Sequence, residues 1–555
     1  METYRNSLIL NYVINKMNMK KIKTKNLLGV ILIAFLFASF SCEDDLDTTP
    51  EDDDAFTTEE FFQKDSAYIK ALGGVYANLN VPSASGAFSS NIGGLDAGTS
   101  TYGRSLMNLQ TFTTDEAIWS YENDPGIAEL QRTTWTAENV ILRGAFGRIM
   151  AGVAFANEFL RQSTDSKLNN RGVSDSKKQE VQVMRAEARV LRALSYYHMM
   201  DLFGKAPFVT EEDPVGNFQS PEINRQEIFD FVEEELLAVV PELKEPMAND
   251  YARVDKGVAW MILAKVYLNA EVYTGTARYA DALEYSEKVI NGGYSLTDEY
   301  VDNFRADNDT NGAQNEIIFP IPADENFSQS FGPTTVMTNG AVGSIEENGD
   351  NLGVTPTAWG GAIRLTPAFV NLFDGQEFAN DDRNRIISED RPLQIESVED
   401  RDQGYILEKY TDVRSDGTVG NELTFSSVDF PMFRLADAYL MYAEAQIRSG
   451  AGTNSQAVQY INALRERANG DSSQNIGISD LTLDFIIDER SRELYWESHR
   501  RQDLIRFDLF TGAAYTWALK GNSLSGIPIS SFRALFPVPN SSLTSNQNLT
   551  QNPGY

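Results

Sequence analysis

Residues 185–207 read RAEARVLRALSYYHMMDLFGKAP. Leu191, Leu194 and Tyr197 recur in this stretch at the spacing of one helix face. Apolar residues three and four positions apart lie on the same side of an α-helix, so they belong to a packed core rather than to a ligand site. The pattern therefore predicts a long amphipathic helix over about 176–203.

The same periodicity continues on both sides of this helix. It begins after a helix-start signal at Thr57 and Glu60, and it predicts further helices over about 57–76, 133–162, 223–240, 255–272, 277–291, 432–449, 454–468 and 481–510. Several of these are adjacent pairs, with small residues at the expected contacts (Ala264, Ala270, Ala280 and Ala282). We expect a mainly α fold, a tetratricopeptide-like helical-repeat scaffold whose repeats are degenerate, because no strict 34-residue consensus recurs.

Three long segments separate the helices, at about 80–131, 293–362 and 375–428. They are rich in Gly, Ser, Thr, Asn and Asp, but they also hold aromatic residues that disordered tracts usually lack. Long loops inside a compact domain are usually functional. We therefore expect ordered loops that form the ligand face of one domain over 56–555.

Composition excludes several classes of function. The 555 residues include 80 acidic and 47 basic side chains, a formal charge of −33 that would repel a phosphate backbone and argues against nucleic-acid binding. Only two histidines occur, His198 and His499, too few for a His-rich zinc site. The single cysteine, Cys42, excludes internal disulfides and CxxC metal sites.

The surroundings of Cys42 resemble a bacterial lipoprotein signal. A basic region (Lys20, Lys21, Lys23 and Lys25) precedes an apolar run over 27–40, and Ser39 and Ser41 lie just before the cysteine. We expect residues 1–41 to be a signal peptide and Cys42 to be lipidated. Phe40 departs from the usual small residue, so an ordinary signal peptide with an incidental cysteine is the alternative, and translation can start at Met17 or Met19.

The segment 42–55 is strongly acidic, with EDDLD at 43–47 and EDDD at 51–54. Such a like-charge block cannot bury a core and predicts a solvated tether. It also resembles the acidic stretch that routes certain bacterial lipoproteins to the outer cell surface. A plain spacer is the alternative.

Three motifs carry a resemblance over nearly the whole mature chain. They are the 185–207 stretch, RLADAYLMYAEA at 434–445, and DERSREL at 488–494 followed by RQDLIR at 501–506; the chain then ends with FPVP at 536–539 and QNPGY at 551–555. Together they resemble the SusD/RagB family of nutrient-binding outer-membrane lipoproteins. The resemblance implies a cell-surface, lipid-anchored glycan-binding protein that works with a TonB-dependent transporter.

The motifs themselves have a structural interpretation. Charged pairs such as Glu187 with Arg189 and Glu489 with Arg492 can connect helices, and the arginines at 500, 501 and 506 favour a structural ion network. His198 and His499 are expected to be packed side chains. The motifs therefore identify the scaffold and not the binding site.

A finer resemblance is to the starch-binding branch of that family. It rests on GLDAG at 94–98, Arg104, TDEAIWSY at 114–121, YLNAEVYTG at 267–275 and RSDG at 414–417. By this resemblance an aromatic arc that cradles malto-oligosaccharide falls on Tyr121, Phe331 and Trp359. The polar partners fall on Asp96, Arg104 and Asp124, or on Asn123 if the loop shifts by one. Tyr121 stands where the branch has Trp, and Phe331 replaces Tyr.

Sugar chemistry agrees with such a set. Flat aromatic faces cover the apolar side of a sugar ring, while carboxylates and Arg forks bind its hydroxyls. The alternative for each ring is a loop anchor that packs against the core.

Residues 307–312 read DNDTNG, the first half of a calcium loop. The twelfth position is Ile318 instead of Glu, so an EF-hand is excluded. We expect no required cofactor and at most a structural Ca²⁺ on Asp307 and Asp309, with Asp429 as a donor by resemblance to the starch-binding branch. An Asx-rich turn is the alternative.

No GxSxG, HExxH or P-loop motif is present. This absence gives no sign of catalytic residues, and the resemblance to the starch-binding branch implies a protein that binds starch or malto-oligosaccharides. The alternatives are the same role for another glycan or nutrient, a surface glycoside hydrolase that uses an unflagged carboxylate pair, and a purely structural lipoprotein.

Overall fold

The computed structural model describes residues 57–555 except 65, 217, 344–348, 356–358 and 389. The chain divides into two units, with the boundary after residue 67. In the first unit, α3 (Thr58–Phe62) begins with the predicted capping box, in which Thr57 and Glu60 exchange hydrogen bonds. The predicted signal peptide, Cys42 and the tether over 42–55 lie outside the described residues.

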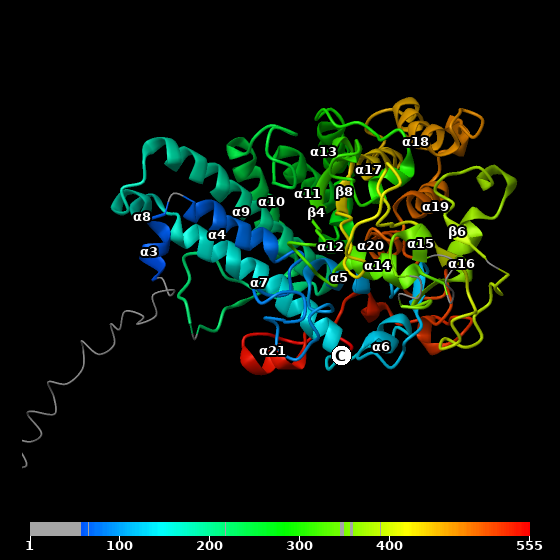
Figure 1. Cartoon of the computed structure of the whole chain (residues 1–555), viewed down its shortest axis with the longest axis horizontal. Helices are drawn as coiled ribbons and strands as arrows, with labels where there is room; N and C mark the ends of the chain where they lie inside the picture. Colours follow the sequence, from blue (N-terminus) through cyan, green and yellow to red (C-terminus); the bar gives the residue numbers. More distant parts are fainter. Residues whose placement is uncertain (1–56, 65, 217, 344–348, 356–358, 389) are drawn as a thin grey trace, which may run out of the picture. The chain divides into compact units, whose positions relative to one another are not determined.

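Helices dominate the described residues from 67 onward, which confirms the mainly α prediction (Figure 1). They are α4 (Ala67–Ala77), α5 (Tyr102–Gln110), α6 (Ile127–Gln131), α7 (Val140–Gln162), α8 (Asp165–Asn170), α9 (Asp175–Leu202), α10 (Arg225–Val239), α11 (Lys256–Leu268), α12 (Ala270–Thr274), α13 (Tyr279–Ile290), α14 (Pro333–Ala341), α15 (Gly349–Leu352), α16 (Pro367–Val370), α17 (Leu435–Ser449), α18 (Asn454–Asn469), α19 (Leu483–Leu494), α20 (Arg500–Arg506) and α21 (Asn540–Ser545).

Successive long helices pack side by side, as a helical-repeat scaffold requires (Figure 1). Helix α9 contacts α7 and α10, and α13 contacts α11 and α17, which in turn contacts α18 and α19. Ala264, Ala270 and Ala282 are fully buried, as expected for close helix contacts. Ala280 is exposed, so its predicted place in a contact was wrong.

Two predicted helices are shorter than their apolar patterns. The stretch 133–162 is helical only from Val140, because Thr133 has a positive φ of 52° and the Asn139 side chain caps the helix start. The stretch 481–510 divides into α19 and α20, because Trp496 and Ser498 between them have φ of 58° and 65°. Apolar spacing does not report such left-handed residues.

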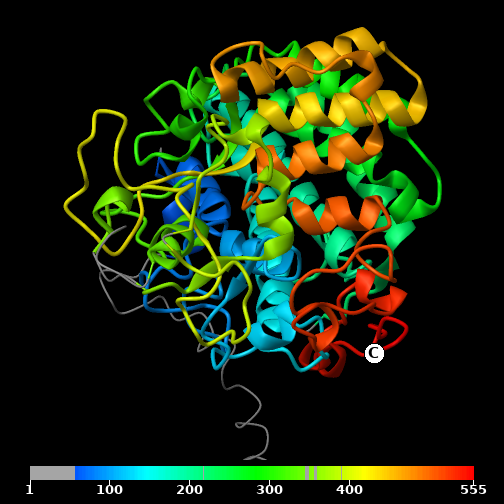
Figure 2. The same cartoon turned by 90° about the vertical axis from the view of Figure 1, so that its right-hand side faces the viewer.

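The strands form short antiparallel pairs, and two of these pairs join segments more than 100 positions apart. The pairs are β1 (Ala117–Trp119) with β5 (Ile363–Leu365), β2 (Lys205–Pro207) with β3 (Glu222–Asn224), β4 (Ile317–Ile321) with β8 (Phe430–Arg434), and β6 (Ile386–Ile387) with β7 (Ile406–Leu407). Figure 2 shows the yellow-green to yellow segment between α14 and β8 on one side of the helices α17 to α19. The predicted loops over 80–131 and 293–362 are not loops throughout, because they contain α5, α6 and α14.

Buried ion pairs connect the C-terminal helices. Arg500 pairs with Asp115, Arg506 with Glu444, and Arg492 with Glu489, which confirms a structural network. Arg501 lies outside it, since its guanidinium donates to the carbonyl oxygens of residues 533 and 534.

Two further expectations concern the motif around 185–207. Glu187 pairs with Arg253 and not with Arg189, whose partner is Glu235. His198 is packed as expected, with its Nδ1 2.7 Å from the hydroxyl of Tyr102. The motif therefore contributes to the packing of the scaffold.

Candidate functional site

The strand pair β1–β5 brings together two segments some 240 positions apart in sequence. Trp119 is in register with Ile363, and the backbone N–H of Ser120 donates to the carbonyl oxygen of Ala362 at 2.7 Å. The loop that carries Trp359 is thereby held beside Trp119 and Tyr121. This pairing positions the aromatic part of the site.

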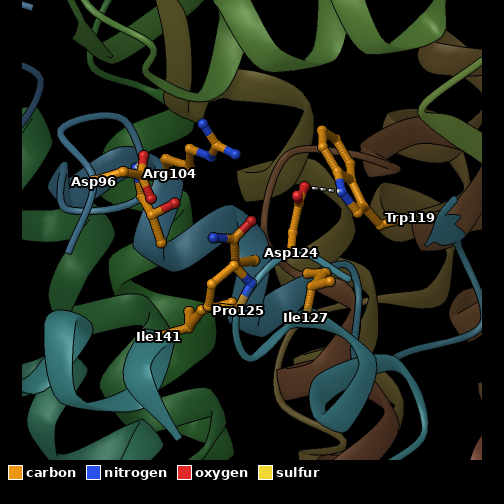
Figure 3. A pocket seen from close by; sticks show the side chains of 9 residues that line it. Asp96, Arg104, Trp119, Asp124, Pro125, Ile127 and Ile141 are labelled. Carbon is orange, nitrogen blue, oxygen red and sulfur yellow. Dashed lines mark hydrogen bonds between the residues drawn. The ribbon is translucent and has the colours of Figure 1, made fainter. Parts of the chain in front are cut away.

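A polar pocket of about 340 Å³ lies beside these segments (Figure 3). Its lining includes Asp96 from the loop before α5, Arg104 from α5, and Asp124 from the loop before α6. The indole N–H of Trp119 donates to the Asp124 carboxylate at 2.8 Å, so one face of this pocket is aromatic. The three predicted polar residues thus share one cavity.

Arg104 is the only cation among the residues that line this pocket. Burial lowers the pKa of its guanidinium, while the carboxylates of Asp96 and Asp124 act in the opposite direction. Its Nη1 donates to the carbonyl oxygen of Phe331 at 3.4 Å, and its Nε has no partner among the described residues. The pocket therefore combines one guanidinium with the carboxylates of Asp96 and Asp124.

Gly98 makes the approach of these groups to one another possible. A Cβ at this position would lie 2.7 Å from Cβ of Phe331 and 2.8 Å from Nη1 of Arg104. Any side chain at this position would therefore separate the aromatic part of the site from the polar pocket.

The aromatic residues form a series of rings in contact. Trp119 has ring centroids 6.2 Å from Tyr121 and 6.1 Å from Trp359, and Trp359 is 6.4 Å from Phe331. Phe331 lies 4.9 Å from the buried Phe425. The three residues predicted as an arc therefore lie together, with Trp119 as the buried ring between Tyr121 and Trp359.

The orientation of Tyr121 is held by hydrogen bonds at its hydroxyl. This group donates to the carbonyl oxygen of Trp359 at 2.8 Å and accepts from Nη1 of Arg401 at 3.0 Å, and the same Nη1 also reaches the carbonyl oxygen of Gly360 at 2.9 Å. The loop that carries Arg401 is held by the buried Arg364, which donates to the carbonyl oxygen of Gln403 at 2.7 Å. Tyr121 is still 38% exposed, which leaves a surface for a ligand.

All six predicted sugar-binding residues are thus gathered in one region, and their role in binding stays a prediction. The sequence pattern assigns no individual role to Trp119, Arg401 or Phe425. No local pattern marks Arg401, because its place beside Tyr121 depends on a loop 280 positions away.

Comparison with known proteins identifies the family of the chain. The sequence profile of the SusD family matches residues 261–555. The starch-binding protein SusD of Bacteroides thetaiotaomicron is 32% identical over 578 aligned positions, which cover 97% of this chain and all of that protein. The chain belongs to the SusD family.

Solved structures share the fold of this SusD-family chain. A SusD superfamily protein from Bacteroides thetaiotaomicron matches with a TM-score of 0.67 at 20% identity, over 88% of this chain and all of that one. Surface glycan-binding protein A of Bacteroides thetaiotaomicron, solved in complex with laminarihexaose, matches with a TM-score of 0.64 at 20% identity, over 88% and 99% of the two chains. At this identity the likeness shows the fold alone.

The predicted calcium ligands have protein partners in this SusD-family chain. The Asp307 carboxylate accepts the backbone N–H of Ser415 at 3.0 Å, and the Asp429 carboxylate accepts from the Ala323 N–H at 2.8 Å and the Tyr251 hydroxyl at 2.9 Å. Among the described residues, no three His, Cys, Asp or Glu side chains lie close enough for one metal ion. Asp307, Asp309 and Asp429 therefore do not form a three-carboxylate calcium site here, and calcium binding stays a prediction.

Glu116, just before β1, gives a pH-dependent prediction. Burial raises its pKa to about 8 from an ordinary 4.5, the charge of Asp115 acts in the same direction, and Arg500 opposes both. The folded chain holds this proton more tightly than the unfolded chain, so the stability contributed by Glu116 falls as the pH rises from about 4.5 to about 8. Glu116→Gln is therefore expected to raise the free energy of unfolding at pH 9 by about 1–3 kcal/mol.

Urea unfolding at pH 4 and pH 9 measures this effect. At pH 4 the Glu116 carboxyl group is mostly protonated in the folded and in the unfolded chain. The substitution is therefore expected to give no gain in the free energy of unfolding. An equal gain at both pH values would show that the charge of Glu116 is not its cause.

Proposed function

We propose that the chain captures starch fragments and malto-oligosaccharides at the cell surface, as a binding protein without catalytic activity. The observation that carries the proposal is the ring series of Tyr121, Trp119, Trp359 and Phe331 beside the pocket of Asp96, Arg104 and Asp124. Aromatic faces cover the apolar side of a sugar, and the carboxylates and guanidinium bind its hydroxyls. The name of the 32%-identical relative, a starch-binding protein, supports α-glucan as the ligand.

A β-glucan is the second candidate ligand. It is considered because a glycan-binding protein of similar fold was solved in complex with laminarihexaose. Calorimetry with maltoheptaose, amylopectin, dextran and laminarihexaose separates the two. Binding of maltoheptaose and amylopectin alone is expected, and binding of laminarihexaose alone would overturn the assignment to α-glucan.

A glycoside hydrolase is the alternative from another class. With 80 acidic residues in the chain, some carboxylate pair will have the separation that such enzymes use. Incubation with amylopectin and measurement of reducing ends tests this, and their release at an enzymatic rate would exclude the non-catalytic proposal. A purely structural lipoprotein would show no glycan affinity in the calorimetry.

Lipid anchoring at Cys42 is a further part of the proposal. Cys42→Ser removes the thiol that would carry the lipid. Covalently attached acyl chains can hold a protein on a membrane without a spanning helix. We expect the variant to leave the membrane fraction and to lose labelling by radioactive palmitate. Unchanged labelling and membrane association would contradict the anchor.

Our proposal for the partner is a TonB-dependent outer-membrane transporter. The chain would act as a hinged lid on the acidic tether over 42–55 and pass the captured oligosaccharide to the transporter. Affinity purification from solubilised membranes is expected to recover a large β-barrel protein. Recovery of the lipoprotein without such a partner would count against the lid.

A further inference from the structure

Phe88 is an exposed aromatic residue at one end of the ring series. Its ring centroid lies 5.5 Å from Phe331 and 6.1 Å from Phe425, with interplanar angles near 70°. Ring contacts therefore run without a break from Tyr121 through Trp119, Trp359 and Phe331 to Phe88. Phe88 is 80% exposed, whereas Phe425, whose ring it contacts, is buried.

The loop that carries Phe88 is fixed at both ends to the scaffold. The buried Arg148 of α7 donates to the carbonyl oxygens of Pro82 at 2.9 Å and Ser100 at 2.5 Å. The hydroxyl of Ser330 donates to the carbonyl oxygen of Asn80 at 2.7 Å, which ties the start of the loop to the segment of Phe331. Phe88 is therefore exposed on an anchored loop and not on a free chain end.

The chemistry of Phe88 differs from that of the pocket. Its side chain has no hydrogen-bonding group, and the polar groups of the pocket lie beside Arg104, which contacts the ring of Trp119 and the carbonyl oxygen of Phe331. A ligand that covers Phe88 must therefore present an apolar face. Because the rings of Phe88 and Phe331 are in contact, the aromatic surface at Phe88 is continuous with the surface proposed to bind the sugar.

We propose that Phe88 forms an additional sugar subsite at the outer end of the aromatic series. Its ring stacks on one sugar unit of an oligosaccharide that already contacts Tyr121, Trp359 and Phe331. The affinity therefore depends on the length of the oligosaccharide. This inference rests on the proposed function. Beyond that function, the inference names a residue that determines which glycan length the protein prefers.

Calorimetry of the full-length protein with maltotriose and maltoheptaose tests the proposal. Phe88→Ala is expected to lower the affinity for maltoheptaose about tenfold, because a stacked ring contributes about a factor of ten to affinity. The affinity for maltotriose is expected to stay unchanged. Phe88→Trp is expected to restore the affinity for maltoheptaose. Because Phe88 is exposed, the unfolding midpoint of both variants is expected to match that of the wild type.

A matched control is Phe155→Ala on α7, where an exposed Phe lies outside the ring series. It is expected to bind both sugars as the wild type does. Equal affinity of Phe88→Ala and the wild type for maltoheptaose would overturn the subsite. An equal loss of affinity for maltotriose and maltoheptaose would overturn it as well. If the wild type binds neither sugar, the proposed function itself fails, and the subsite fails with it.

Discussion

Replacement of Glu493 by Gln is expected to lower the free energy of unfolding by about 3–5 kcal/mol, because it breaks a buried ion pair from one side. The Glu493 carboxylate accepts from Arg434 at 2.6 Å, from Arg383 at 3.4 Å and from Arg467, and its side chain is completely buried. Burial alone would raise its pKa, but these guanidinium groups outweigh burial and hold the pKa well below the ordinary value.

The neutral amide would leave three buried guanidinium groups short of one negative charge. Urea unfolding at pH 7 measures the loss. Glu158→Gln is the matched control, because Glu158 forms an exposed pair with Arg161 on α7, and surface pairs of this kind contribute about 0–1 kcal/mol. A midpoint for Glu493→Gln equal to that of Glu158→Gln would show that the network does not stabilise the fold.

The pH dependence of the same group has a definite sign. A carboxyl group with a lowered pKa stabilises the fold above its unfolded pKa, and this contribution is lost as the pH falls. The difference in the free energy of unfolding between the wild type and Glu493→Gln is therefore expected to shrink as the pH is lowered below about 4. In this range the carboxyl group takes up a proton in the unfolded chain.

Replacement of Trp359 by Ala is expected to weaken maltoheptaose binding by about 10- to 100-fold. Trp359 is the ring that contacts both Trp119 and Phe331, so its loss interrupts the series in the middle. Its backbone carbonyl also accepts the Tyr121 hydroxyl, and this bond survives the substitution. The measured effect therefore reports the indole face itself.

Tyr121→Ala is expected to have a comparable effect, because it removes both a ring and the contact of Arg401. Tyr121→Phe keeps the ring and loses only the hydroxyl, so a smaller loss is expected. Calorimetry measures affinity, and the unfolding midpoint of each variant shows whether the fold is intact. Wild-type affinity in Trp359→Ala would exclude the aromatic series as the sugar platform.

Much of the scaffold followed from local pattern. The spacing of Leu191, Leu194 and Tyr197 predicted α9, because helical periodicity is a property of neighbours in the chain. The interruptions at Thr133, Trp496 and Ser498 could not be predicted, since a positive φ in these residues is imposed by the surrounding fold and not by their own preference. The repeat architecture was therefore predicted more accurately than the bounds of its helices.

The candidate site divides in the same way. Resemblance selected Asp96, Arg104 and Tyr121 from one continuous region of sequence, and Trp359 and Phe331 from another. Only the tertiary structure showed Arg401 on the Tyr121 hydroxyl and Phe88 beside Phe331, because those contacts depend on chain segments more than 200 positions apart.

Local sequence therefore determined which helices form and which residue types are available for a sugar. The order of the rings and the pocket that Arg104 and Asp124 line were decided by long-range packing. The physical reason is that helix formation is governed by neighbours three and four positions apart, whereas a binding surface depends on how strands such as β1 and β5 pair across the whole chain.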